Sequence, residues 1–211
     1  ACAGQIPSIM HKHEIEVERP FIDGRLGSSY AVISTVIKVY EKHRIHKSRN
    51  LLVLVGIGFL GKTVMENLET SGYRVQGIDI AATKSGIHIG DIALEILSEA
   101  DVVVVLTPRG QDFVPYLKHL KPGTIIIDDT HPQLRHRSEK NPVYKVALEW
   151  PGFEFQPRLP GFKKQWIPGC MVEAIVKSRA DHSCSSSDYG DFSKSARRAE
   201  IGVIVDQLKN T

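Results

Sequence analysis

Residues 51–61, Leu-Leu-Val-Leu-Val-Gly-Ile-Gly-Phe-Leu-Gly, constrain the fold more than any other part of this 211-residue chain. Five consecutive aliphatic residues predict a strand that is buried on both faces of a parallel sheet. Val64 and Leu68 follow at helical spacing, so the glycine turn lies between a strand and a helix. This context favours a phosphate-binding turn over a turn whose glycines serve only packing.

Each residue of this turn has an expected role in binding a dinucleotide. Gly56 permits the tight turn, Gly58 lets the backbone approach a pyrophosphate, and Gly61 lets the helix pack close to the strand. The helix starts with Phe59 and Leu60, so it offers unpaired N–H groups and a partial positive charge to the phosphates. We therefore expect all five residues to bind the cofactor.

The next predicted strand ends in an acid about 20 residues further along, as a dinucleotide site requires. Residues 73–79 read as this strand, and the Asp79 carboxylate would accept hydrogen bonds from the adenosine ribose. Its charge would repel a 2′-phosphate, so Asp79 favours NAD, and the adjoining Ile80 is expected to bind the cofactor as well. Lys84 could pair with that phosphate, which leaves NADP open, or it could be an ordinary solvated lysine.

The rest of the chain alternates predicted helices and strands. A helix over 28–46 leads into the first strand, and a closing helix is expected over 193–209. Between them lie the expected helices 91–100 and 111–120, the strands 101–106 and 124–128, and two apolar runs, 143–150 and 171–176. This alternation predicts an α/β fold, a doubly wound parallel sheet of the Rossmann type with a short N-terminal extension.

Three segments follow from this order. Residues 1–48 form the N-terminal segment and the helix that leads into the sheet, and residues 49–140 form the NAD(P)-binding core. Residues 141–211 complete the sheet and the site. A 42% hydrophobic chain of this length can bury one sizeable core.

Composition excludes several classes of function. The formal net charge of +3 is slight, and the basic residues in 42–49 lack interleaved aromatic residues, so no nucleic-acid partner is expected. Because there is no apolar run of about 20 residues and no signal-peptide pattern, we expect no membrane insertion and a cytoplasmic protein. Cys2, Cys170 and Cys184 are too few and too widely spaced for a disulfide framework or a zinc site, and no metal is expected.

The chemistry should lie in the loops after the strands, because ligands bind at the carboxyl ends of the strands in an open α/β sheet. Thr107 and Pro108 should pass near the nicotinamide ribose, and Thr130 should contact the cofactor from the next loop. His131 could exchange a proton during hydride transfer, or it could cap its loop by hydrogen bonding. Arg109 could hold a carboxylate or phosphate, or it could be a surface arginine.

Two further segments resemble a known family. Residues 167–175, Ile-Pro-Gly-Cys-Met-Val-Glu-Ala-Ile, followed by Gly-Asp-Phe-Ser at 190–193, resemble the C-terminal region of the long-chain acyl-thioester reductases that make fatty aldehydes. In that family a cysteine stands in a C-x-x-E-A context, and an N-F-S or D-F-S segment precedes a closing helix. Residues 4–9, Gly-Gln-Ile-Pro-Ser-Ile, are similar to a stretch upstream of the family's glycine turn.

The resemblance implies that Cys170 is a nucleophile that takes an acyl group from a carrier-bound thioester before hydride reduces it to an aldehyde. Glu173 would orient groups at the site or stabilise its own first helical turn, and the alternative for Cys170 is a small buried residue. The chain departs from the family in three ways. The family turn reads G-A-T-G-x-x-G, its members generally use NADP whereas Asp79 favours NAD, and they carry an additional N-terminal region that helps to enclose the acyl chain. A full enzyme would then need residues beyond this sequence, or a smaller substrate.

Three hypotheses of function follow. The first is a nicotinamide-dependent oxidoreductase that acts on an acyl thioester or aldehyde through Cys170. The second is a hydroxy or amino acid dehydrogenase that uses His131 or Arg109, since residues 106–108 and the turn 121–123 resemble those dehydrogenases. The third is a dinucleotide-binding module without turnover. The expected partner is a small-molecule or carrier-bound substrate, and a homo-oligomer or a partner domain that completes the site is left open.

Overall fold

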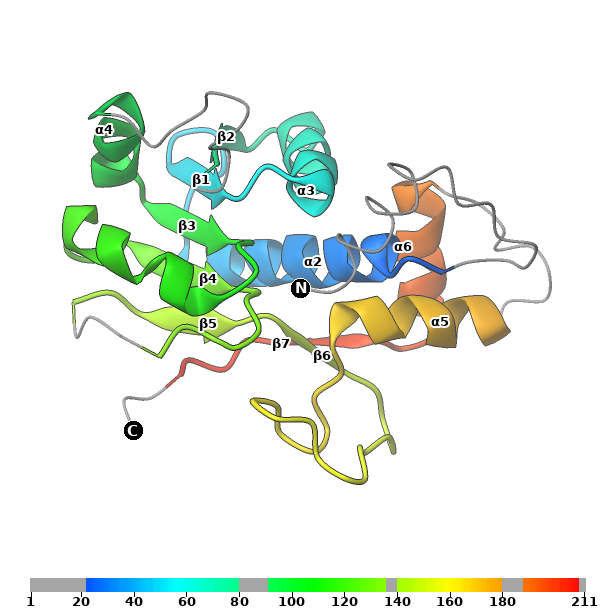
Figure 1. Cartoon of the computed structure of the whole chain (residues 1–211). Coiled ribbons are helices and arrows are strands. Elements are labelled where there is room, and N and C mark those ends of the chain that lie inside the picture. Colours follow the sequence, from blue (N-terminus) through cyan, green and yellow to red (C-terminus); the bar gives the residue numbers. More distant parts are fainter. Residues whose placement is uncertain (1–21, 80–90, 136–139, 180–187, 209–211) are drawn as a thin grey trace, which may run out of the picture.

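The computed structural model describes residues 22–79, 91–135, 140–179 and 188–208. Within these ranges five parallel strands form one sheet in the order β2-β1-β3-β4-β5 (Figure 1). The strands are β1 (Leu51–Val55), β2 (Arg74–Ile78), β3 (Val102–Val105), β4 (Ile125–Asp128) and β5 (Val143–Lys145). The chain starts at β1, moves outward to β2 and returns to the other side of β1 as β3. This reversal places a topological switch point between β1 and β3, which is where open α/β sheets bind their ligands.

Helices cover both faces of the sheet, so the predicted doubly wound α/β fold is confirmed. One core holds α2 (Arg25–His43) and α3 (Phe59–Thr70), with α5 (Gly169–Arg179) and α6 (Tyr189–Arg198) packed against α2. The other core holds α4 (Asp91–Glu99) and the short 3-10 helices η1 (Gly110–Asp112) and η2 (Val114–His119). Because successive strand residues face opposite sides, Leu52 and Leu54 enter the first core while Val53 and Val55 enter the second. Among the described helices, none combines the length and the apolar character that a membrane crossing requires.

The C-terminal end differs from the predicted helix over 193–209. Helix α6 ends at Arg198, and Glu200 adopts a left-handed φ of 58°. The chain then forms β7 (Gly202–Ile204), which pairs antiparallel with β6 (Ala147–Glu149). The β-branched run 203–205 favours a strand, and pairing with β6 supplies the backbone hydrogen bonds that a helix would have supplied. The helical spacing of the apolar residues in 201–208 was therefore misleading.

Two helix boundaries and one helix type also differ from prediction. Helix α2 begins at Arg25 rather than at residue 28, and it ends at His43 because Arg44 adopts a left-handed φ of 54°. The helix expected over 111–120 forms η1 and η2 instead. In a continuous α-helix over 111–120, Pro115 would lie in the interior and could not donate a hydrogen bond to the preceding turn. In the structure Pro115 lies in the first turn of η2, where its missing N–H costs nothing.

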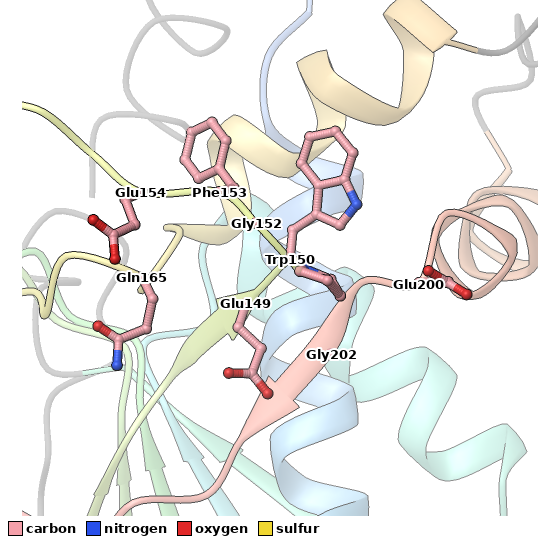
Figure 2. A pocket seen from close by; sticks show the side chains of 9 residues that line it. Glu149, Trp150, Gly152, Phe153, Glu154, Gln165, Glu200 and Gly202 are labelled. Atoms are coloured by element: carbon pink, nitrogen blue, oxygen red, sulfur yellow. The ribbon is translucent and has the colours of Figure 1, made fainter.

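A cavity of about 490 Å³ lies beside the small β6–β7 sheet. Figure 2 shows Trp150 and Phe153 along its wall, with Glu149, Glu154 and Glu200 around it. The two aromatic rings stack with their centroids 6.0 Å apart. The carboxylates give the lining a negative charge, which would repel a pyrophosphate. This cavity therefore does not suit a dinucleotide, whose expected site is the switch point of the large sheet.

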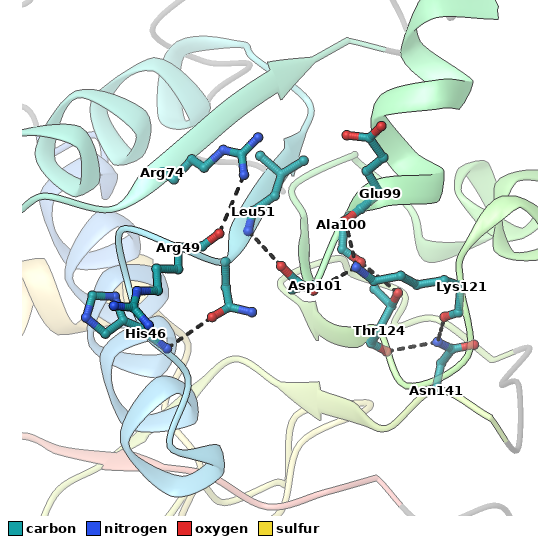
Figure 3. Close-up of polar contacts among 11 residues, drawn as sticks. His46, Arg49, Leu51, Arg74, Glu99, Ala100, Asp101, Lys121, Thr124 and Asn141 are labelled. Atoms are coloured by element: carbon teal, nitrogen blue, oxygen red, sulfur yellow. Dashed lines mark hydrogen bonds and ion pairs between the residues drawn. The ribbon is translucent and has the colours of Figure 1, made fainter.

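A hydrogen-bond network joins the amino ends of the strands (Figure 3). The Asp101 carboxylate accepts a hydrogen bond from the Leu51 N–H at 2.8 Å and forms an ion pair with Lys121 at 2.7 Å. Asn141 Nδ2 donates to the carbonyls of Lys121 and Thr124, both at 2.9 Å. Burial by itself would raise the pKa of Asp101, but the hydrogen bonds from Lys121 and Leu51 hold that pKa below its ordinary value. The network secures the edge of the sheet opposite to the switch-point loops.

Candidate functional site

The fold itself requires glycine at the first and last positions of the turn after β1. Gly56 has a left-handed φ of 104°, and its N–H donates to the carbonyl of Ile78 at 2.8 Å. A Cβ on Gly56 would lie 3.2 Å from the Leu106 carbonyl, in the loop after β3. A Cβ on Gly61 would lie only 2.1 Å from the Gly56 oxygen, because α3 packs directly on the turn. The turn is therefore wedged between β2 and the β3 loop at the switch point.

The middle glycine is different, because no described part of the chain requires it. Gly58 has an ordinary φ of −76°, and a Cβ added there would meet none of the described atoms within 4 Å. Gly58 is also the N-cap residue of α3, and no described side chain caps that helix. The first N–H groups of α3, those of Phe59, Leu60 and Gly61, precede the first intrahelical bond, from Lys62 to Gly58. Open space in front of an uncapped helix start suits an anion.

Arg25 adds a cation beside this helix start. Its guanidinium carbon lies 4.5 Å from the centre of the Phe59 ring. Its Nε is buried and has no hydrogen-bond partner within the described ranges, which is costly for a guanidinium N–H. An anionic ligand at the start of α3 would supply the missing acceptor, so these residues fit a pyrophosphate. The sequence did not indicate Arg25, because the predicted helix began after it.

The acid predicted to bind the ribose lies beside the same turn. Asp79 is half-buried and directly follows β2, whose last residue, Ile78, accepts the hydrogen bond from Gly56. The other two residues predicted for this end of the cofactor, Ile80 and Lys84, lie outside the described residues. The structure thus brings Asp79, the glycine turn and Arg25 to one end of the switch point.

The loop after β3 supplies Thr107 to the site but not Arg109. Thr107 is buried, and its Oγ1 donates to the Arg109 carbonyl at 3.0 Å, so its hydroxyl shapes the loop. Pro108 is exposed next to it. The Arg109 guanidinium is 68% exposed and forms an ion pair with Asp112 at 2.9 Å. Its side chain is therefore engaged at the surface with the next turn of the chain.

The loop after β4 is held from two sides. The buried Asp128 carboxylate accepts hydrogen bonds from the Thr130 N–H at 2.9 Å, the Thr130 hydroxyl at 2.5 Å and the Leu134 N–H at 2.8 Å. The ammonium of Lys145, at the end of β5, donates to the Asp128 and Thr130 carbonyls at 3.1 and 2.6 Å. Lys145 is only 2% exposed, which is rare for a lysine. The sequence analysis missed it, although a lysine inside the apolar run 143–148 was the available signal.

His131 and Asp129 are the titratable side chains that this loop presents. The His131 ring lies at the surface with its centroid 5.7 Å from that of Phe162. Partial burial and the nearby Lys145 charge lower the pKa of His131, so the ring is neutral at pH 7. Asp129 is half-buried, and burial raises its pKa to about 6 although Lys145 opposes the change. Its N–H donates to the Val105 carbonyl at 3.1 Å, which ties the loop to the end of β3.

Cys170 is the second residue of α5 and lies half-buried against the start of α2. A Cβ on Gly24 would approach the Cys170 Cβ to 2.7 Å. Burial raises the pKa of the thiol, and the negative charge of Asp129 raises it further, although backbone N–H groups at the helix start oppose this. Cys170 is thus near the edge of the sheet that carries the loops, but its thiol is held in the protonated form.

Glu173 caps a helix other than its own. Its carboxylate is buried and accepts hydrogen bonds from the Leu26 N–H at 2.8 Å and the Gly27 N–H at 3.3 Å. Lys177 forms an ion pair with it at 2.7 Å. Glu173 was expected to stabilise the first turn of its own helix, but it stabilises the first turn of α2 instead. This cap holds α5, and with it Cys170, against the residues that follow Arg25.

Comparisons with known proteins find similarity over part of the chain. No protein family's model matches the chain. Over 98 residues it is 29% identical to the bifunctional protein FolD of Mycoplasma genitalium, a match that covers 46% of this chain and 32% of that protein. The chain therefore spans about a third of that curated relative.

Within the described residues, no group of three or more His, Cys, Asp or Glu side chains could hold a metal ion.

Two solved structures share part of the fold. The NAD⁺-bound 3-phosphoglycerate dehydrogenase of Entamoeba histolytica is 23% identical with a TM-score of 0.39, over 51% of this chain and 39% of that chain. A probable 2-hydroxyacid dehydrogenase of Rhizobium etli in complex with NADP is 17% identical with a TM-score of 0.34, over 50% of this chain and 43% of that chain. Both are dehydrogenases by name, rather than acyl-thioester reductases.

Proposed function

We propose that this chain is the cofactor-binding part of a nicotinamide-dependent oxidoreductase. The observation that carries the proposal is Gly58, where the described residues leave open space at the start of α3 and no described side chain caps the helix. A glycine that the fold does not need is explained by a ligand that approaches the backbone there. Its place at the switch point between β1 and β3 is where such sheets bind dinucleotides.

Different residues around the switch point would bind different parts of the dinucleotide. The α3 N–H groups and the Arg25 guanidinium would hold the pyrophosphate, and Asp79 would accept hydrogen bonds from the adenosine ribose. The loops that contain Thr107 and Thr130 would border the nicotinamide end. The bound nicotinamide supplies the hydride acceptor or donor, and the chain's own residues orient the substrate and move its proton.

Direct binding tests this proposal. The purified protein is titrated with NADH, NAD⁺, NADPH and NADP⁺ in a calorimeter. We expect saturable binding of either the NAD⁺ and NADH pair or the NADP⁺ and NADPH pair. We expect NAD(H) to bind more tightly, because the Asp79 carboxylate would repel a 2′-phosphate. Turnover is then followed by cofactor absorbance with 2-hydroxy acids, amino acids, aldehydes and acyl thioesters. Absence of binding contradicts the proposal, and binding without any turnover supports a non-catalytic module instead.

The covalent route through Cys170 is a second candidate, favoured by the position of this cysteine in the first turn of α5 near the β4 loop. It requires a thiolate, whereas burial raises the thiol pKa. It predicts an acyl adduct on Cys170 when the protein meets an acyl thioester, and mass spectrometry would detect it. Cofactor turnover without an adduct would favour the hydroxy or amino acid dehydrogenase, with His131 or Arg109 as the assisting residue.

Cys170 should be a slow target for alkylation at neutral pH. In a Cys2→Ser, Cys184→Ser background, iodoacetamide should modify it more slowly than it modifies free glutathione, because only the thiolate reacts and burial disfavours that form. The rate should rise as the pH passes above about 9. Mass spectrometry of the Cys170 peptide measures the rate, and the urea-unfolded protein gives the unshifted rate as a control. Fast modification that stays constant between about pH 6 and 8 would instead show an activated thiolate.

A further inference from the structure

The loop after β4, at the carboxyl edge of the sheet, contains one carboxylate that its own hydrogen bonds do not use, that of Asp129. In this loop both oxygens of Asp128 and the hydroxyl of Thr130 are used in hydrogen bonds that shape the backbone. Asp129 lies between them in the sequence, yet its carboxylate receives no hydrogen bond from the described residues, and only its N–H is bound, to Val105. The loop is therefore rigid, and the Asp129 side chain is what it presents.

The buried ammonium of Lys145, next to Asp129, is not explained by the stability of the fold. Lys145 is buried on β5, and two of its three ammonium protons go to the Asp128 and Thr130 carbonyls. Burying an ammonium costs several kcal/mol, and an apolar residue of similar size usually serves stability as well or better. A buried lysine beside a half-buried acid, at the ligand edge of the sheet, is therefore better explained by chemistry than by stability.

We propose that Asp129 is the proton-transfer residue of this oxidoreductase, and that Lys145 positions its loop. The inference rests on the proposed function and assigns the substrate class, an alcohol or the corresponding carbonyl compound. In oxidation, the O–H bond of the substrate breaks and its proton goes to the Asp129 carboxylate. The hydrogen on the carbinol carbon leaves with its electron pair as hydride, for which the oxidised dinucleotide is the acceptor, and a C=O bond remains. Asp129 is half-buried and keeps partial access to solvent, so the proton then passes to water.

Asp129 suits this role better than the other titratable groups around it. His131 lies at the surface against Phe162, and Arg109 is paired with Asp112. Among the described residues, the charges that act on Asp129 are those of Lys145 on β5 and of Asp128, and Asp129 in turn raises the pKa of Cys170 on α5. A carboxyl group that titrates near neutral pH can both accept and return a proton.

The test compares Asp129→Asn with a matched surface control, Asp206→Asn, whose aspartate pairs with the exposed Lys163. The first readout is the melting temperature of the ligand-free protein between pH 4 and 8. The folded-state pKa of Asp129 lies above the value of about 3.9 in an unfolded chain, so its ionisation costs stability as the pH rises through about 6. Asp129→Asn should therefore melt at a higher temperature than wild type above about pH 7 and show a flatter pH profile. Asp206→Asn should follow the wild-type profile.

The second readout separates this inference from the proposed function. Asp129→Asn should bind the dinucleotide within about threefold of wild type but lose turnover by about 100-fold or more, and Asp129→Glu should restore part of it. Lack of dinucleotide binding or turnover by the wild type contradicts the proposed function. An active wild type with an equally active Asp129→Asn contradicts only the role of Asp129. A lower melting temperature of Asp129→Asn above about pH 7 would show a structural aspartate and would also overturn the inference.

Discussion

Gly58→Asp should weaken dinucleotide binding severely and leave the folded protein at least as stable as wild type. The new side chain fits, because an added Cβ meets no described atom within 4 Å and the φ of −76° is ordinary for any residue. Aspartate is also a good N-cap, so it gains up to a few tenths of a kcal/mol over glycine at the start of α3. In the bound state the same carboxylate would occupy the place of the phosphates and repel them. Affinity should fall on the order of 100-fold or more, which is about 3 kcal/mol.

Two matched variants show whether the loss comes from the ligand or from the fold. Gly58→Ala adds only a methyl group to the same open space and should weaken binding less than Gly58→Asp. Gly61→Ala places its Cβ 2.1 Å from the Gly56 oxygen, so it should lower the melting temperature as well as the affinity. Calorimetry with NADH and thermal melting of the ligand-free variants give the two quantities. If Gly58→Asp bound NADH as tightly as wild type, the phosphates could not lie at the start of α3.

Glu173→Ala should lower the free energy of unfolding by about 3 kcal/mol. The side chain is 1% exposed and accepts hydrogen bonds from the Leu26 and Gly27 N–H groups. Its removal leaves those two donors of α2 without an acceptor and leaves the Lys177 ammonium, only 22% exposed, without its partner. Caps and buried charge-assisted hydrogen bonds of this kind are each worth about 1 to 3 kcal/mol. Urea unfolding followed by circular dichroism measures the loss.

Glu173→Gln is the informative companion. It keeps an oxygen for the α2 N–H groups and removes only the charge, so its destabilisation should lie between that of wild type and that of Glu173→Ala. Because Glu173 holds α5 against α2, the alanine variant should also expose Cys170 and speed its alkylation. A loss below about 1 kcal/mol in Glu173→Ala would mean that the carboxylate does not cap α2.

The sequence predicted the glycine turn and its surroundings because their signals are local. Aliphatic runs, helical spacing and glycines within residues 51–79 indicate β1, α3 and β2; the structure has all three elements, and the two strands lie within a residue of the expected bounds. Their parallel pairing followed from the alternation of strand and helix. Local signals failed where pairing competed with periodicity, as at β7, whose partner β6 lies more than fifty residues earlier.

Asp79 and Thr107 could be expected at the ligand edge, because Asp79 directly follows β2 and Thr107 lies two residues after β3, and both strands belong to a parallel sheet. Arg109 followed from the same rule, but its ion pair with Asp112 engages it at the surface. The role of Glu173 could not be predicted, because the residues it caps are 147 and 146 positions away. The burial of Lys145 could not be predicted either, because it depends on which loop covers the end of β5.

The sequence alone thus determined an α/β sheet and a glycine turn between its first strand and the next helix, because strand, turn and helix propensities depend on neighbours a few residues apart. Only the tertiary structure decided which charged groups surround that turn. It placed Arg25 over Phe59, made Glu173 the cap of α2 and left the Asp129 carboxylate, near Lys145, without a hydrogen bond from the described residues. These choices depend on burial and on contacts between distant segments, and burial is what determines whether a charged side chain is paired, protonated or available for chemistry.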